Sequence, residues 1–343
     1  DDEVVPQFEP QPSGQGTDEE LRALLESLQP RIRVYGVGGA GCNAVGRLDA
    51  EGLFENSFVT GYAINTDAQA LLMSPLEHKV LIGRTARGRG AGGDPTKGEA
   101  AALESEMALR GITTDTQLAI IAAGMGGGSG TGAAGHIARL AKEQGAMTIA
   151  VVTYPFQSEG ATRRENAEWG LERLREHCDT ILVIPNERLL EIEGVKDLPL
   201  ASAFRVGDEL LVRSIIGVTE LLTRDGMVNL DFEDLKAVIH SGAGVAMIGL
   251  GAGSGPGRAE EATLEALHSP LLDLDFSDGA SGHGRQQDAA QCIAQRVTKA
   301  SLEGLKGNRC AGIGSLINFD DAGCQKLSDR TLHRTPSMIS GIA

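Results

Sequence analysis

GMGGGSGTG, residues 124–132, is the stretch that decides the fold of this chain. It follows an apolar run at residues 118–123, which predicts a buried strand, and it precedes residues 133–144, which predict a helix. A backbone without Cβ atoms can turn tightly and point several N–H groups at an anion. The helix that follows adds the positive end of its dipole. This unit therefore predicts a phosphate-binding loop, whereas a flexible linker would not lie between a buried strand and a helix.

The loop lacks a feature of the common phosphate-binding motif. No lysine follows its glycines, so it does not match the pattern G-x-x-x-x-G-K-[ST]. The charge of a bound phosphate must then be met by backbone N–H groups, by the hydroxyls of Ser129 and Thr131, and by a metal ion.

A second glycine loop, GVGGAGCN, occupies residues 36–43. It follows a short predicted strand at residues 32–35 and opens a predicted helix at residues 44–51. Alone it matches the dinucleotide fingerprint G-x-G-x-x-G, so an NAD-dependent Rossmann enzyme is one alternative. The acidic residue expected roughly 20 residues later comes further on, at Asp67. Two such loops after parallel strands favour one nucleotide whose long phosphate tail is held from both sides.

Composition limits the class of protein. The chain of 343 residues has 31 basic and 47 acidic residues and a net charge of −16, which argues against nucleic acid as a partner. No apolar stretch approaches the roughly 18 residues of a membrane span, so we expect no direct membrane insertion. The acidic first residues lack a signal-peptide pattern, and five cysteines without metal-like spacing fit a reducing cytosol. We therefore expect a cytoplasmic protein.

The order of apolar and helical segments predicts an α/β fold. Beyond the strands already named, continuous apolar runs at 59–64, 79–82, 148–153 and 180–184 alternate with helical segments. This pattern predicts a parallel, Rossmann-like sheet covered by helices on both faces. A long helix at residues 201–223 would be the spine between two domains.

We expect four regions along the chain. Residues 1–30 form an acidic tail plus a short helix at 18–29, residues 31–200 a nucleotide-binding domain, residues 201–225 the central helix, and residues 226–343 a smaller α+β domain. In that last region, residues 231–241 and 258–268 read as helices, and residues 243–250 and 271–276 as strands. Near Gly279 this pattern breaks, and residues 280–343 carry three of the five cysteines and few apolar clusters.

Eight ordered segments together resemble the FtsZ family of tubulin-like GTPases. They are GVGGAGCNAV (36–45), INTDAQAL (64–71), GRGAGGDPTKG (88–98), GMGGGSGTG (124–132), VVTYPFQSEGATRR (151–164), ILVIPNERLL (181–190), AFRVGDELL (203–211) and GMVNLDFEDLKAV (226–238). The resemblance covers roughly residues 30–278 and is of the archaeal type, because Asp208 stands where many bacterial members have Asn. Ser129 replaces the usual Thr and keeps its hydroxyl. Residues 280–343 depart from the family, as a reading-frame error or a divergent terminus would.

The resemblance implies a site for GTP or GDP, with Mg²⁺ carried mainly by the phosphates. The phosphates would be held by the two glycine loops, at Gly38, Gly39, Ala40, Gly41, Cys42, Asn43, Gly126, Gly127, Gly128, Ser129, Gly130, Thr131 and Gly132. Gly92, Gly93 and Asp94 would close over the γ-phosphate, although Asp94-Pro95 also reads as an ordinary helix start.

The same resemblance implies how sugar and base are held. Glu159 would bind the ribose and Arg163 would lie near the base and sugar, although their spacing alone predicts a routine helical ion pair. Asn186 and Asp208 would read guanine, and Phe204 would stack on the base. By itself Phe204 reads as a core residue.

A last constellation contains Asn229, Asp231 and Asp234. The two aspartates are three residues apart at a predicted helix start, which alone predicts capping. The resemblance implies instead that they polarise the water attacking the γ-phosphate on the next subunit of a filament. The expected protein is therefore a GTPase that polymerises head to tail into a ring at the division site, with unidentified membrane-tether or division partners. A cell-shape paralogue and a catalytically weak regulatory paralogue are further alternatives.

Overall fold

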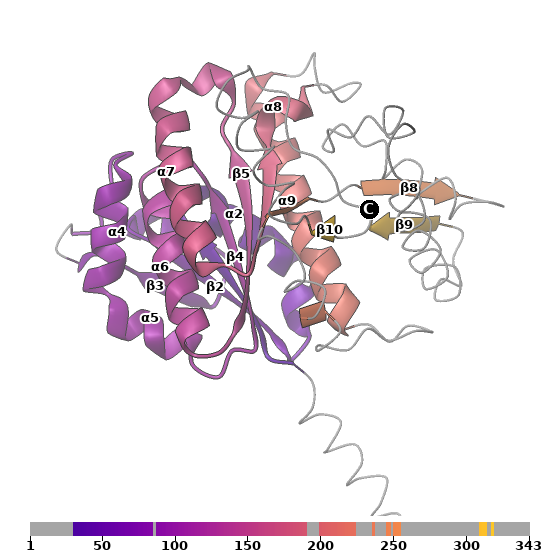
Figure 1. The fold of residues 1–343 in the computed structure, drawn as a ribbon, viewed down its shortest axis with the longest axis horizontal. Coiled ribbons are helices and arrows are strands. Elements are labelled where there is room, and N and C mark those ends of the chain that lie inside the picture. Colours follow the sequence, from indigo (N-terminus) through magenta and orange to yellow (C-terminus); the bar gives the residue numbers. More distant parts are fainter. Residues whose placement is uncertain are drawn as a thin grey trace, which may run out of the picture.

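The structure is a computed structural model that describes residues 30–84, 87–190, 199–223, 235–236, 245–247, 250–254, 309–313 and 317–318 (Figure 1). The predicted helices at 18–29 and 258–268 and the predicted strand at 271–276 lie outside these residues. The predicted helix at 231–241 does too, apart from residues 235–236.

One sheet forms the centre of the fold, in the strand order β10-β7-β6-β5-β4-β1-β2-β3. The seven strands from β7 to β3 run parallel, and β10 joins the edge antiparallel to β7. All six strands predicted between residues 32 and 184 are confirmed. The bounds are β1 Ile32–Val37, β2 Val59–Asn65, β3 His78–Leu81, β4 Leu118–Gly124, β5 Met147–Tyr154, β6 Thr180–Pro185, β7 Val245–Met247 and β10 Ile317–Asn318.

Helices cover both faces because the central strands bury alternate residues in two separate cores. Ile32 and Val34 of β1 pack in a core with α2 and α9, while Tyr35 and Val37 pack in a second core with α4, α5, α6 and α7. In Figure 1, α9 lies between the large sheet and the pair β8–β9. The bounds are α2 Gly38–Ala50, α3 Ala68–Met73, α4 Pro95–Glu104, α5 Glu106–Thr113, α6 Ser129–Glu143, α7 Ala161–His177, α8 Asn186–Leu189 and α9 Leu200–Thr223.

Two helices begin earlier than predicted, inside the glycine loops. Helix α2 starts at Gly38 and helix α6 at Ser129, so each glycine run supplies the first turn of its helix. The sequence predicts later starts because glycine has a low helix propensity. The structure shows why glycine is needed: a Cβ on Gly41 would lie 2.1 Å from the carbonyl oxygen of Ala122 in β4. Glycine thus lets α2 pack against the sheet backbone.

The second domain is described only in part. Strand β8 (Leu250–Ser254) pairs antiparallel with β9 (Arg309–Ile313) in a separate two-stranded sheet. The single strand predicted at 243–250 is wrong, since β7 and β8 belong to different sheets. Strands β9 and β10 both lie in residues 280–343, which we expected to depart from the family pattern.

Within the described ranges, no helix combines the length and the hydropathy that a membrane crossing requires.

The Gly41 contact yields a test of the α2–sheet packing. Gly41→Ala should lower the free energy of unfolding by about 3 kcal/mol or more, because the blocking atom belongs to backbone and cannot move aside. Gly111→Ala on the exposed face of α5 is the matched control, since a Cβ there meets nothing within 4 Å, and it should be neutral or stabilise by up to about 1 kcal/mol. Urea unfolding of the variants measures both; equal stability of Gly41→Ala and wild type would contradict the packing.

Candidate functional site

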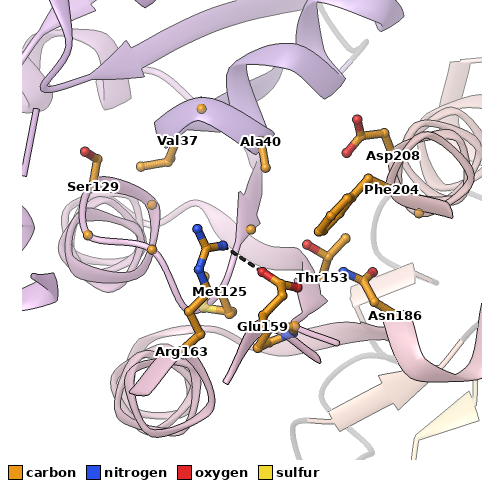
Figure 2. Close-up of a pocket in the computed structure, with 17 residues that line it drawn as sticks. Val37, Ala40, Met125, Ser129, Thr153, Glu159, Arg163, Asn186, Phe204 and Asp208 are labelled. Carbon is orange, nitrogen blue, oxygen red and sulfur yellow. Dashed lines mark hydrogen bonds and ion pairs between the residues drawn. The ribbon is translucent and has the colours of Figure 1, made fainter. Parts of the chain in front are cut away.

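A cleft of about 230 Å³ opens where β1, β4, β5 and β6 end (Figure 2). The chain leaves β1 toward β2 and β3 on one side and returns through β4 on the other, so the cleft lies at the topological switch point of the sheet. Open α/β sheets bind ligands at this position. The cleft is lined by Val37, Gly39, Ala40, Gly124, Met125, Gly127, Gly128, Ser129, Gly130, Thr153, Pro155, Glu159, Arg163, Asn186, Phe204, Gly207 and Asp208.

At one end of the cleft the two glycine loops touch. Gly38 has a φ of +72°, and a Cβ on it would lie 2.6 Å from the backbone nitrogen of Gly130. A Cβ on Gly130 would in turn lie 3.0 Å from the carbonyl oxygen of Val37. Backbone therefore packs directly on backbone, which brings the starts of α2 and α6 together.

The first turns of α2 and α6 have no side-chain cap. Their N-cap residues, Val37 and Gly128, have no side chain that accepts a hydrogen bond from the backbone N–H groups of the first turn. The side chains of Asp67 and Asp94, in contrast, accept such bonds at the starts of α3 and α4. The first N–H groups of a helix need an acceptor, and together with the dipole they favour an anion. Two uncapped helix starts, both contributing residues to one cleft, suit a ligand with more than one phosphate.

Two glycines of the lining have no explanation inside the protein. A Cβ on Gly39 or Gly127 would meet no atom within 4 Å, and neither residue has a left-handed backbone. Both face the cleft. Close approach of a ligand to the backbone is the remaining reason for glycine at these positions.

The two hydroxyls expected at the phosphates have different places. Ser129 lines the cleft, and its Oγ lies 2.5 Å from Oγ1 of buried Thr66. Thr131 is fully buried, and its Oγ1 accepts a hydrogen bond of 2.9 Å from the backbone N–H of Gly126. Thr131 therefore braces the glycine loop from behind and does not line the cleft.

At the opposite end of the cleft, Asn186 carries an unsatisfied acceptor. Its side chain is 5% exposed, and its Oδ1 is buried with no hydrogen-bond partner among the described residues. A Cβ on Gly207 would lie 3.0 Å from this oxygen, so glycine at 207 keeps space beside it. A buried acceptor without a donor is costly, so a donor on a bound ligand would complete this site.

Phe204 lies between Asn186 and Asp208 in the cleft (Figure 2). Its ring contacts the buried ring of Phe156 edge-on, with 5.1 Å between the centroids. Phe204 is 36% exposed, since it lines the cleft. Asp208 is half-buried, and burial raises the pKa of its carboxyl, an effect opposed by the guanidinium of Arg47 at 3.9 Å. An aromatic face flanked by two oxygen acceptors suits a flat base that carries N–H donors.

Glu159 and Arg163 occupy the wall between the two ends. One carboxylate oxygen of Glu159 accepts from the backbone N–H of Phe156 at 2.8 Å, and the other pairs with Arg163 at 2.7 Å. Glu159 is nearly buried, whereas the Arg163 side chain is 55% exposed. The ion pair thus exists and points its charges into the cleft (Figure 2), but it is not a pair within one helix, because Glu159 lies in a 3-10 turn and α7 begins at Ala161.

Several residues predicted for the site do not line the cleft. The thiol of Cys42 is buried against backbone carbonyls, and burial raises its pKa to about 12, so it fills space and has no nucleophilic character. Asp94 caps α4 through Thr96, as the alternative interpretation of that segment predicts. Asp67 caps α3 in the same way, through the backbone N–H groups of Gln69 and Ala70. The other predicted residues outside the lining are Gly38, Gly41, Asn43, Gly92, Gly93, Gly126, Thr131 and Gly132.

Gly92 and Gly93 lie outside the lining but in a loop next to it. A Cβ on Gly128 would lie 2.9 Å from the backbone nitrogen of Asp94, so the loop containing Gly92 and Gly93 packs beside the glycine loop. The residues Asn229, Asp231 and Asp234 lie outside the described residues.

Six lining residues were not named as site residues from the sequence: Val37, Gly124 and Met125, which lie within the two predicted glycine loops, and Thr153, Pro155 and Gly207. All but Gly207 lie at the carboxyl end of a strand or directly follow one, so the carboxyl-end rule for parallel sheets would have found them. Gly207 carries a different signal, since it stands directly before Asp208 in AFRVGDELL.

The described part of the chain contains no group of three or more His, Cys, Asp or Glu side chains that could hold a metal ion.

Comparisons with known proteins agree with this geometry. Residues 31–194 match the Tubulin/FtsZ family, GTPase domain, and residues 244–300 match the FtsZ family, C-terminal domain. The second match continues past residue 278, where we expected the resemblance to end, so the departure from the family begins later than predicted.

Two curated relatives are archaeal. The chain is 48% identical over 289 residues to "Cell division protein FtsZ 1" of Pyrococcus furiosus, covering 82% of this chain and 76% of the relative. It is also 48% identical over 294 residues to the protein of the same name from Halobacterium salinarum, covering 83% and 73%.

Solved structures give the same result. An FtsZ dimer from M. jannaschii aligns with a TM-score of 0.71 at 47% identity, over 76% of this chain and 74% of that one. CetZ2 from Haloferax volcanii aligns with a TM-score of 0.65 at 21% identity, over 88% and 99%, which shows a shared fold alone.

The unexplained glycines give a prediction for ligand binding. Gly127→Ala should keep the stability of the wild type but weaken guanosine diphosphate binding at least about tenfold, because the new methyl group would enter the ligand's space. Gly111→Ala, equally open but outside the cleft, should bind normally. Titration calorimetry measures both affinities; unchanged binding by Gly127→Ala would mean that no ligand approaches this backbone.

Proposed function

The chain belongs to the FtsZ family of tubulin-like cell-division GTPases, and we propose from this that its cleft is the GTP site. In the proposed arrangement the phosphates lie at the starts of α2 and α6, the ribose lies at Glu159, and guanine lies on Phe204 between Asn186 and Asp208. The observation that carries the proposal is the buried, unpartnered Oδ1 of Asn186.

Guanine fits the two acceptors for a chemical reason. Its N1–H and its exocyclic amino group are adjacent donors on one edge, and a carboxylate such as that of Asp208 accepts both, while the Asn186 amide oxygen accepts one further donor hydrogen from the base. Adenine lacks this donor pair, so it would leave a partly buried carboxylate and a buried amide oxygen unpaired. The ring of Phe204, fixed edge-on by Phe156, supplies the stacking face.

The phosphate end works mainly through backbone. Uncapped N–H groups of α2 and α6 and the hydroxyl of Ser129 would receive the phosphate oxygens. No carboxylate cluster is available in the described residues, so Mg²⁺ would be held mainly by the phosphates themselves and would neutralise part of their charge.

Among the described residues that line the cleft, none at its phosphate end is acidic. Its two lining carboxylates, Glu159 and Asp208, lie at the sugar and base end (Figure 2). A residue that positions the attacking water must then come from elsewhere. In our proposal Asn229, Asp231 and Asp234 of the next subunit supply it, which makes hydrolysis depend on head-to-tail assembly.

Self-assembly of this kind leads to the proposed cellular role. The similar M. jannaschii protein is described as a dimer, in line with association between copies. We infer that this chain forms filaments of a division ring in the cytoplasm and that other proteins attach the ring to the membrane. The identities of 48% to two proteins named for cell division favour this role over one in cell shape.

Asp208→Ala tests whether Asp208 recognises the guanine base. The variant should lose its preference for GTP over ATP by at least about tenfold while its phosphate affinity changes little, because the glycine loops are untouched. Glu209→Ala is the control, since Glu209 is the neighbouring acid of α9 and pairs with Arg213 outside the lining. Nucleotide competition on purified protein gives the preference; equal binding of GTP and ATP by the wild type would refute guanine recognition.

Asp234→Ala tests the shared site. Binding of GTP should remain, while hydrolysis should fall on the order of 10²-fold and filaments should persist. Because each acid would act on a neighbour's nucleotide, adding the variant to wild type at constant total protein should slow hydrolysis and lengthen filament lifetime. Glu172→Ala, an exposed acid of α7, is the control. A rate that falls only in proportion to the wild-type fraction, with unchanged filament lifetime, would rule out the shared site.

A further inference from the structure

We propose that Arg47 is a positioning residue for guanine recognition, holding the Asp208 carboxylate in place from the neighbouring helix α2. The inference rests on the proposed role of Asp208 and assigns the residue that supports it.

Arg47 reaches helix α9 from the last turn of α2. Its Nη2 lies 3.9 Å from Oδ2 of Asp208, and its Nη1 donates to the carbonyl oxygen of Arg205 at 3.5 Å. The two acceptors are three residues apart on α9, so one guanidinium contacts a single turn of that helix at two points. The side chains of Arg47 and Asp208 are 37% and 23% exposed, which leaves the pair partly shielded from solvent.

Asp208 needs such support more than the other acid of the cleft. Glu159 has both oxygens occupied, by a backbone N–H and by Arg163. Asp208 has no hydrogen bond to another described residue, and its burial favours the neutral acid. A neutral carboxylic acid offers one acceptor oxygen fewer to the two guanine donors. The charge of Arg47 opposes this protonation.

The other charged groups near Asp208 are engaged elsewhere. Arg163 pairs with Glu159 across the cleft, and Glu209 pairs with Arg213 along α9. Arg205 directs its guanidinium to the hydroxyl of Ser202 at 3.2 Å. Within the described residues, Arg47 is thus the cation that acts on Asp208.

The same helix connects both ends of the ligand site. Helix α2 starts at Gly38 beside the phosphate loops, and Arg47 lies nine residues later, a rise of about 14 Å. Helix α2 packs on α9, and Val45 and Leu48 of α2 share one hydrophobic core with Leu211 and Ile215 of α9. At 3.9 Å the contact with Oδ2 is an ion pair and not a hydrogen bond, so both oxygens of Asp208 can still accept from the base. The ion pair holds the carboxylate in place relative to the phosphate site.

The test compares the affinities of guanosine and adenosine diphosphates. Arg47→Met keeps an unbranched apolar stem but removes the charge, and it should lower the guanine preference about tenfold at neutral pH. The loss should grow as the pH is lowered, because burial raises the pKa of Asp208 and the variant lacks the guanidinium that opposes this rise. Arg47→Lys should restore part of the preference, and Arg213→Met, an arginine of α9 outside the cleft, should have no effect.

A double-mutant cycle separates positioning from packing. In an Asp208→Ala background, Arg47→Met should cause no further change in guanine preference. An equal loss of both nucleotides, or a full effect of Arg47→Met without Asp208, would overturn the proposal and show that Arg47 only packs α2 on α9. If Asp208→Ala itself leaves the preference unchanged, the proposed function of Asp208 fails instead.

Discussion

The direct contact between Gly38 and Gly130 is the constraint on which the rest of the site depends. A single Cβ at Gly38 would lie 2.6 Å from the neighbouring backbone, so the two loops can meet only as glycine. Their contact sets the starts of α2 and α6 side by side at the switch point of the sheet. Part of the base end is placed from the same helices, because α9, which contains Phe204 and Asp208, packs on α2.

The cleft divides its work between backbone and side chains. At the phosphate end it offers helix starts and glycines, which bind anions of many kinds without distinguishing bases. At the far end it offers an aromatic ring and two acceptors whose pairing depends on the base. Asn186 and Asp208 are each incomplete without a ligand, one through its unpartnered oxygen and the other through a desolvated carboxyl. These two acceptors favour a base with several N–H donors and disfavour a base that would leave them unpaired.

The sequence predicts the fold well where one physical rule dominates. The central strands β1, β4, β5 and β6 are buried on both faces, so their apolar runs, such as LAIIAA in β4, mark them clearly. The helix starts were misplaced because glycine propensity opposes a helix that close packing at Gly41 and Gly132 requires. The roles of single hydroxyls and thiols could not be predicted from the sequence. Ser129 and Thr131 look equivalent in GGGSGTG, but the structure shows that Ser129 lines the cleft and that Thr131 accepts a hydrogen bond from the loop backbone.

The central claim is that one chain binds the nucleotide but needs a second copy to hydrolyse it. The most direct test is the GTP turnover rate per subunit, measured over a dilution series of the purified protein with light scattering as a parallel readout of assembly. Turnover per subunit should be near zero at low concentration and rise above a threshold that coincides with the onset of scattering. A turnover rate per subunit that stays constant across the whole series would contradict the account and indicate a complete site within one chain.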